Sequence, residues 1–165
     1  MKVRKAQTED AEIITQINVE TWQDAYQGII DDSILSARKV DDKRISTWAE
    51  IIKNPESVVL VCENVEGIMG YLSAGPARDN YGIKNEIIAL YVKPVAQRNG
   101  AGSALIKAYK QIINEQCFYL YALKKNQKAR CFYEKNGGVI YEKFSRNLNI
   151  QGQEYEEVCY VFGEE

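Results

Sequence analysis

Residues 90–103 read LYVKPVAQRNGAGS, and this stretch decides the fold. The pattern predicts a strand that closes at Pro94, a glycine turn over 99–102 and an amphipathic helix from about Ser103 to Asn114. Glycines let successive backbone N–H groups point inward, and the dipole of the following helix adds positive potential, so the turn suits a phosphate group. Taken alone, two glycines favour an ordinary strand-to-helix connection, and the rest of the chain has to decide.

The hydrophobic pattern on either side of this stretch alternates between strand and helix periods. We expect strands at 3–6, 58–62, 68–74, 86–92, 117–123, 139–148 and 155–162, and helices at about 9–28, 41–53, 103–114 and 126–136. Thr8 is expected to cap the first helix, Gly28 to end it, and residues 31–33 to form an irregular turn. The order indicates one mixed α/β domain over residues 1–165, without repeats or linkers.

The composition narrows the function. The 165 residues are 45% apolar and 27% charged, with a net charge of −2, which is typical of a globular protein and offers no basic run for nucleic acid. We expect a cytoplasmic protein, because neither a signal peptide nor an apolar stretch of ~20 residues is present. Four scattered cysteines indicate reduced, mostly buried thiols and no metal site. The absence of histidine excludes hydrolases that need an imidazole base.

A second motif follows about 20 residues after the glycine turn. Residues 126–137 read NQKARCFYEKNG, with an asparagine after a strand and an aromatic-Tyr-Glu-Lys-x-Gly ending to the next helix. Together with the match of QRNGAG at 97–102 to the pattern Q/R-x-x-G-x-G/A, it makes the chain resemble the GCN5-related N-acetyltransferase (GNAT) family. The resemblance covers nearly the whole chain.

The resemblance implies both a fold and a cofactor. The fold is α/β (α+β), a mixed, mostly antiparallel central sheet of about seven strands with helices on both faces, split at the CoA cleft between the fourth and fifth strands. Acetyl-CoA is the acyl donor, its pantetheine lies in that gap, and no metal takes part. A homodimer is plausible on the same ground. The implied cofactor-binding residues are Leu90, Tyr91, Val92, Gln97, Arg98, Asn99, Gly100, Ala101, Gly102, Ser103, Asn126, Ala129, Phe132 and Tyr133.

Two residues are catalytic candidates. Tyr133 occupies the family position that protonates the departing thiolate, and phenol and thiol pKa values differ by only about 1.5 units. The alternative is a tyrosine that packs on its helix. Glu86 stands where some relatives carry a glutamate base, and the alternative is a solvated carboxylate at a strand end. Because neither motif places a cysteine as acyl carrier, we expect direct transfer in a ternary complex, with Glu86 or ordered water as the base.

The acceptor is expected to be a small-molecule amine. The segment 20–30 is rich in aromatic residues, as in a subgroup of bacterial family members, and we expect Trp22, Asp24, Tyr26 and Asp31 to bind a small cationic amine such as a polyamine. Alternatively, Trp22 and Tyr26 simply cover the core. Two rival functions stay open, a protein N-terminal or lysine acetyltransferase and a non-catalytic acyl-CoA-sensing module.

Overall fold

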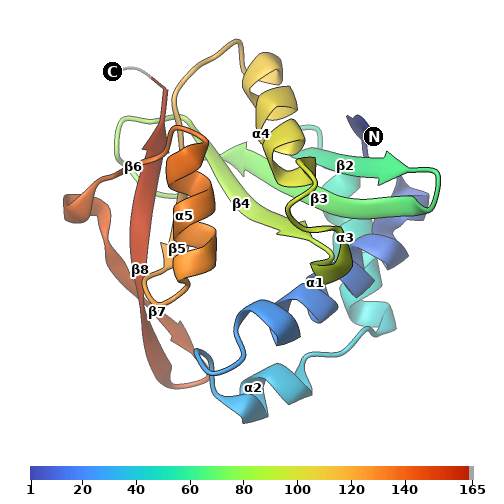
Figure 1. Ribbon diagram of the computed structural model, residues 1–165, viewed down its shortest axis with the longest axis horizontal. Helices are drawn as coiled ribbons and strands as arrows, with labels where there is room; N and C mark the ends of the chain where they lie inside the picture. Colours follow the sequence, from blue (N-terminus) through green and yellow to red (C-terminus); the bar gives the residue numbers. More distant parts are fainter. Residues whose placement is uncertain (164–165) are drawn as a thin grey trace.

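The structure, a computed structural model, describes residues 1–163 and is built on one eight-stranded sheet (Figure 1). The strand order is β1-β2-β3-β4-β5-β8-β6, with β7 paired to β8. All pairs are antiparallel except β4 with β5, which confirms the predicted mostly antiparallel sheet. The strands are β1 (Lys2–Lys5), β2 (Val58–Asn64), β3 (Gly67–Pro76), β4 (Asn85–Val92), β5 (Phe118–Leu123), β6 (Val139–Ile140), β7 (Arg146–Ile150) and β8 (Gln153–Phe162).

Helices cover both faces of the sheet because successive strand residues point to opposite sides. On β2, Leu60 packs in the cluster that contains Leu105 of α4, whereas Val59 packs with Ile14 and Ile17 of α1. None of the helices within residues 1–163 is long and apolar enough to cross a membrane. The helices are α1 (Ala11–Ala25), α2 (Asp32–Ala37), α3 (Asp42–Lys53), α4 (Ala101–Ile112) and α5 (Gln127–Lys135), with 3₁₀ turns η1 (Thr8–Asp10), η2 (Pro94–Ala96) and η3 (Glu142–Phe144).

The sheet is split at β4 and β5, as predicted. These strands pair only at Asn85 with Phe118 and at Glu86 with Tyr119, and then separate (Figure 1). On its other edge β4 stays paired with β3, but a bulge leaves Ile88 without a partner there. The backbone of 87–92 on the β5 side therefore borders an opening.

Three details of the predicted elements are wrong. Residues 31–33 begin a short helix, α2, because the Asp31 carboxylate accepts a hydrogen bond from the Ser33 N–H at 2.9 Å. The strand expected at 139–148 is interrupted by η3, where the Phe144 ring stacks on Tyr81 with centroids 3.8 Å apart. Thr8 does not cap the first helix; Gln7 and Asp10 form the capping box of η1 instead.

Candidate active site

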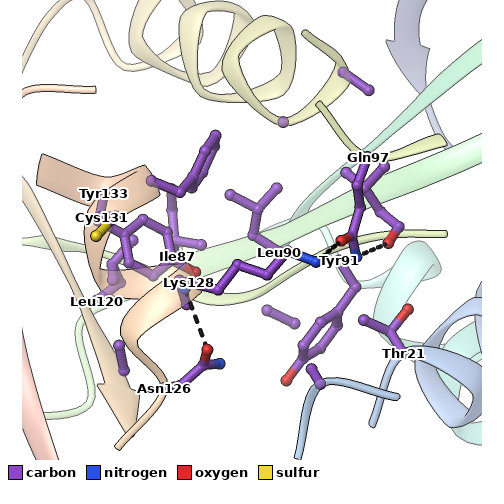
Figure 2. Close-up of a pocket in the computed structure, with 18 of the residues that line it drawn as sticks. Thr21, Ile87, Leu90, Tyr91, Gln97, Leu120, Asn126, Lys128, Cys131 and Tyr133 are labelled. Atoms are coloured by element: carbon purple, nitrogen blue, oxygen red, sulfur yellow. Dashed lines mark hydrogen bonds between the residues drawn. The ribbon is translucent and has the colours of Figure 1, made fainter. Parts of the chain in front are cut away.

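A cleft of about 1130 Å³ opens where β4 and β5 separate, bounded by the start of α4 and by α5 (Figure 2). Its walls contain every residue predicted to bind the cofactor except Asn99, which is exposed and does not line the cleft. The structure therefore brings the two sequence motifs, 97–103 and 126–133, to opposite sides of one hollow.

The first turn of α4 has backbone N–H groups that no side chain caps. Asp31, Asp41 and Asn126 cap α2, α3 and α5, but α4 begins at Gly100 without a cap. Gly100 has φ +84, a left-handed conformation that strains any residue with a side chain. First-turn N–H groups have no partner within a helix, so those of residues 101–103 are available to an anion in the cleft.

Gly102 allows α4 and α5 to approach each other closely. A Cβ atom at this position would lie 2.8 Å from Cζ of Phe132, far inside normal contact. The glycine that the sequence motif requires therefore has a packing reason, distinct from the backbone conformation that fixes Gly100. Phe132 directly precedes Tyr133 on α5, so this contact also positions the candidate acid.

A lysine crosses the mouth of the cleft. The Gln97 amide donates to the Val92 carbonyl oxygen at 3.0 Å, and its own oxygen accepts a hydrogen bond from the Lys128 ammonium group. Figure 2 shows the Lys128 side chain reaching from α5 towards Gln97. Lys128 was not among the predicted residues. Its cation is held by Gln97, three residues before the Gly100 that starts α4, where it would add to the attraction for phosphate.

Three tyrosines from different elements meet at the gap in the sheet. The hydroxyls of Tyr26 and Tyr91 are 3.2 Å apart, and the Trp22 indole donates to Tyr91 at 3.1 Å. Tyr133 lines the cleft, and within residues 1–163 its hydroxyl has no hydrogen-bond partner. Burial, with smaller contributions from Tyr91 and Tyr160, raises the pKa of Tyr133 well above its ordinary value. Tyr133 therefore holds its proton at neutral pH and can donate it.

Glu86 is fully buried, so its interpretation as a solvated strand-end carboxylate is wrong. Its Oε2 atom accepts from the Arg78 backbone N–H and from Arg78 Nε, both at 3.0 Å, and from the Tyr119 hydroxyl at 3.2 Å. Its Oε1 atom accepts from Arg78 Nη2 at 2.6 Å. A base role for Glu86 would require the carboxylate to exchange one of these bonds for the acceptor or a water molecule.

A second hollow, of about 270 Å³, lies next to the cleft at the gap in the sheet. The two share the lining residues Tyr26, Ile87, Ile88, Tyr91, Tyr121 and Leu123. Two ion pairs, Arg78 with Glu86 and Arg146 with Glu157, contribute to its walls. The two hollows thus share these residues as a common wall, with the start of α4 in the lining of the first and residues of β7 and β8 in the lining of the second.

The residues predicted to bind the acceptor are only partly assembled. Tyr26 lines both hollows, Trp22 the second and Asp24 the cleft, whereas Asp31 lines neither because its carboxylate caps α2. The Trp22 ring is covered by the Arg38 guanidinium at 3.9 Å. An aromatic face that already holds a cation is not open to a second one, and both rings pack on the cluster around Ile30, as in the core alternative.

Several lining residues escaped the sequence analysis. Thr21 is buried on the cleft, and within the described part of the chain its hydroxyl oxygen has no hydrogen-bond partner. Cys131, expected to be buried, is exposed and lines the cleft. The one available signal was Glu157, a carboxylate that directly precedes the apolar and aromatic run 158–162 of the same strand and is buried with it.

Comparison with known proteins identifies the family. The model of the acetyltransferase (GNAT) family matches residues 14–138. An uncharacterized N-acetyltransferase, YuaI of Bacillus subtilis (strain 168), is 26% identical over 139 residues, which are 80% of this chain and 76% of that protein.

Solved structures share the fold. The PaiA N-acetyltransferase of Thermoplasma acidophilum in complex with coenzyme A has a TM-score of 0.78 at 19% identity, with 99% of this chain and 98% of that chain covered. The ribosomal-protein-alanine N-acetyltransferase of Brucella melitensis has a TM-score of 0.75 at 17% identity, with 99% and 100% covered. Because the family model spans most of the sequence, this chain belongs to the acetyltransferase (GNAT) family and is an acetyl-CoA-dependent acyltransferase.

Proposed function

We propose that the protein transfers the acetyl group of acetyl-CoA to the primary amine of a small molecule, directly and in a ternary complex. The observation that carries this proposal is the pair of adjoining hollows at the split in the sheet, with an uncapped helix start in the wall of the first. Donor and acceptor enter from opposite ends and meet at the tyrosines. The amine nitrogen attacks the thioester carbonyl, a C–N bond forms, and the C–S bond breaks.

The donor half follows from backbone groups that have no other partner. The pyrophosphate lies against the N–H groups of residues 101–103, where the helix dipole and Lys128 favour negative charge. The pantetheine amides bond to the β5-facing edge of 87–92, which the separation of the strands leaves unpaired. Phe132 and Leu90 supply apolar walls for the chain between them.

Tyr133 protonates the thiolate as it leaves. Burial raises the pKa of Tyr133 and so weakens it as an acid, but the same burial raises the proton affinity of a thiolate in the cleft. The difference between the two groups, about 1.5 units in water, therefore changes less than either value. Tyr133 regains a proton from solvent or through the neighbouring hydroxyls of Tyr91 and Tyr26.

The proton of the attacking amine needs a separate acceptor. Glu86 lies at the second hollow but is held by Arg78, while Glu157 lines the same hollow. Among the side chains of residues 1–163, Glu157 accepts only through Oε2, from Arg146 at 2.9 Å. An ordered water that contacts either carboxylate would serve equally well as the relay. Replacing Glu86 and Glu157 separately by glutamine distinguishes these candidates by the acidic limb of the rate profile.

The acceptor class rests on fewer residues than the donor. A small cationic amine is supported by Asp24, which is exposed on the cleft wall. Transfer to a protein N-terminus or lysine is the second candidate. A hollow of about 270 Å³ is slightly smaller than typical small-molecule sites of roughly 300–1,000 Å³, so it suits a small molecule better than a peptide.

Direct transfer has one competitor on the cleft wall. Cys131 is exposed beside the donor site, so its thiol could carry the acetyl group. The change Cys131→Ser should leave turnover intact, with no acetyl-enzyme formed on mixing with acetyl-CoA alone. Acetylation of Cys131 at a rate matching turnover would replace direct transfer by a two-step reaction.

The central test is Tyr133→Phe, assayed by CoA release with a pool of amines. Loss of general acid catalysis should lower kcat by ~10²–10⁴-fold, while the affinity for acetyl-CoA stays unchanged because the ring remains. Near-normal kcat in a folded variant, under conditions where chemistry limits the rate, would show that another group protonates the thiolate. If the protein binds acetyl-CoA but releases no CoA with any amine of the pool, a sensing module is favoured.

A further inference from the structure

The two ion pairs of the second hollow are unequal in exposure. The Arg78 side chain is 54% exposed and its partner Glu86 only 1%, while Arg146 is 33% exposed and Glu157 10%. In each pair the arginine is thus the more exposed partner, and the buried carboxylate holds it in place. All four side chains line the hollow.

Both guanidinium groups keep donors for a ligand. Arg78 uses Nε and Nη2 for Glu86, and Arg146 uses Nε for Glu157 and Nη1 for Asp79. Within residues 1–163, Arg78 Nη1 and Arg146 Nη2 have no hydrogen-bond partner. The Arg146 plane is further fixed by the Tyr121 ring, 3.6 Å below it. Planar, pre-oriented N–H donors of this kind bind a carboxylate, which accepts hydrogen bonds, and not a cation, which cannot.

The remaining walls set the size and polarity of the rest of the ligand. Ile30, Leu123, Leu148 and Ile150 line the hollow, and the tyrosine hydroxyls lie at its junction with the cleft. An ammonium group in this space would face two guanidinium groups whose charges Glu86 and Glu157 already balance, whereas a carboxylate can accept from their remaining N–H groups. An amine with one anionic end and an apolar body satisfies all three features.

We propose that the acceptor is a small amino acid with an apolar side chain, and that Arg78 and Arg146 bind its carboxylate. This inference rests on the proposed amine acetylation and replaces the cationic acceptor by a zwitterionic one. With the carboxylate held at the arginines, the amine points to the gap in the sheet, where the acetyl group of the donor is expected. The hollow of about 270 Å³ leaves room for few atoms beyond these.

The first experiment compares leucine, leucinamide and isoamylamine, which share a side chain but differ in the group beside the amine. Leucine should show the highest kcat/KM, and its advantage over isoamylamine should be about 10–100-fold, as expected for charge-assisted hydrogen bonds. Equal or better use of isoamylamine, or of a polyamine, would overturn the inference while leaving amine acetylation in place.

Matched variants locate the effect. Alanine at Arg78 would leave Glu86 buried and unpaired, so the tests are Arg78→Lys and Arg146→Lys, which retain the charge and lose the fork. Each should raise the KM for leucine by roughly 10-fold or more, and by clearly more than it raises that for isoamylamine. The control Lys84→Gln removes an exposed charge on the β3–β4 loop, outside both hollows, and should alter neither.

A binding measurement decides the matter even without turnover. Calorimetry in the presence of CoA should detect 4-methylpentanoate, which keeps the carboxylate and side chain of leucine but lacks the amine. Arg78→Lys should weaken that binding by about the same factor as it raises the KM for leucine. Absence of binding to the wild-type protein would overturn the carboxylate site. Binding without acetylation of any amine would preserve the site and refute the proposed function.

Discussion

Gly102→Ala offers a quantitative test of how α4 and α5 form the cleft. Replacing glycine by alanine inside a helix normally stabilises it by about 1 kcal/mol. At this position the new methyl carbon would lie 2.8 Å from Cζ and 3.1 Å from Cε2 of Phe132, and overpacking of this kind costs about 1–3 kcal/mol. The two effects predict a net loss of about 0–2 kcal/mol.

A double-mutant cycle separates these contributions. Phe132→Leu removes the part of the ring that the methyl group would meet, so Gly102→Ala in that background should regain the helix gain of about 1 kcal/mol. Urea unfolding of the four proteins gives the coupling energy, expected at about 1–3 kcal/mol. Gly75→Ala is the control, because its added carbon would meet nothing closer than 3.8 Å.

Additive effects in this cycle would refute the packing role of Gly102. The same proteins report on function, since a displaced Phe132 carries Tyr133 with it on α5. We expect Gly102→Ala to lower kcat as well as acetyl-CoA affinity, and Phe132→Leu to restore part of the affinity. Restored stability with no restored affinity would show that the loss of affinity arises at the phosphate site and not from the packing of Phe132.

The other predictions concern single charges. Ser103→Glu places a carboxylate at the exposed start of α4, where the helix dipole tolerates it, and should weaken acetyl-CoA binding by at least about 10-fold, unlike Ser103→Gln, as calorimetry would record. Asp24→Asn should raise the KM only for cationic acceptors, because Asp24 lines the cleft. Asp31→Asn should have no effect on KM, because asparagine keeps the α2 cap. Equal effects of the two variants would disprove the assignment of Asp24, and not Asp31, to the acceptor site. The hydrogen bond from Arg4 lowers the pKa of Asp10, so its stabilisation is present above pH ~4 and is lost as pH falls through the folded value. Asp10→Asn should therefore cost roughly 0.5–1.5 kcal/mol at pH 7 and flatten the acid limb of stability, both measured by urea unfolding.

The order of strands and helices was predictable because the apolar residues of each element recur with the spacing of a strand or of a helix. Val58–Asn64 alternates towards two helical layers, and α4 shows an apolar stripe at Leu105, Ile106 and Tyr109. The failures lie where tertiary contacts overrode local signals. Ile34 and Leu35 dock onto Leu123 and make a six-residue helix of a stretch that looks like a turn. Tyr81 stacks on Phe144 and breaks a strand that its own pattern predicts as continuous.

The donor half of the candidate site was predictable for a related reason. Its chemistry is backbone chemistry, which glycines and an asparagine cap reveal in sequence order. The acceptor half depends on side chains from four distant segments, with Arg78, Arg146 and Glu157 brought together only by the sheet. Trp22 and Asp31 were predicted to belong to it because they lie near one another in sequence. In the structure the Arg38 guanidinium covers the Trp22 ring, and the Asp31 carboxylate accepts a hydrogen bond from the Ser33 N–H. The homodimer and the cytoplasmic location stay predictions.

The split in the sheet explains why so many unusual features gather at one place. Two neighbouring parallel strands would normally pair along their length, so something must hold β4 and β5 apart. β5 is paired with β8 over all six of its residues, and β4 with β3, while the contact of Gly102 with Phe132 joins α4 to α5 over the opening. The Arg78–Glu86 pair stands where the strands diverge, and its buried carboxylate also accepts from Tyr119 on β5. The same bonds that hold the two strands together at this end orient the arginine towards the acceptor, so the point of divergence and the specificity of the site depend on one ion pair.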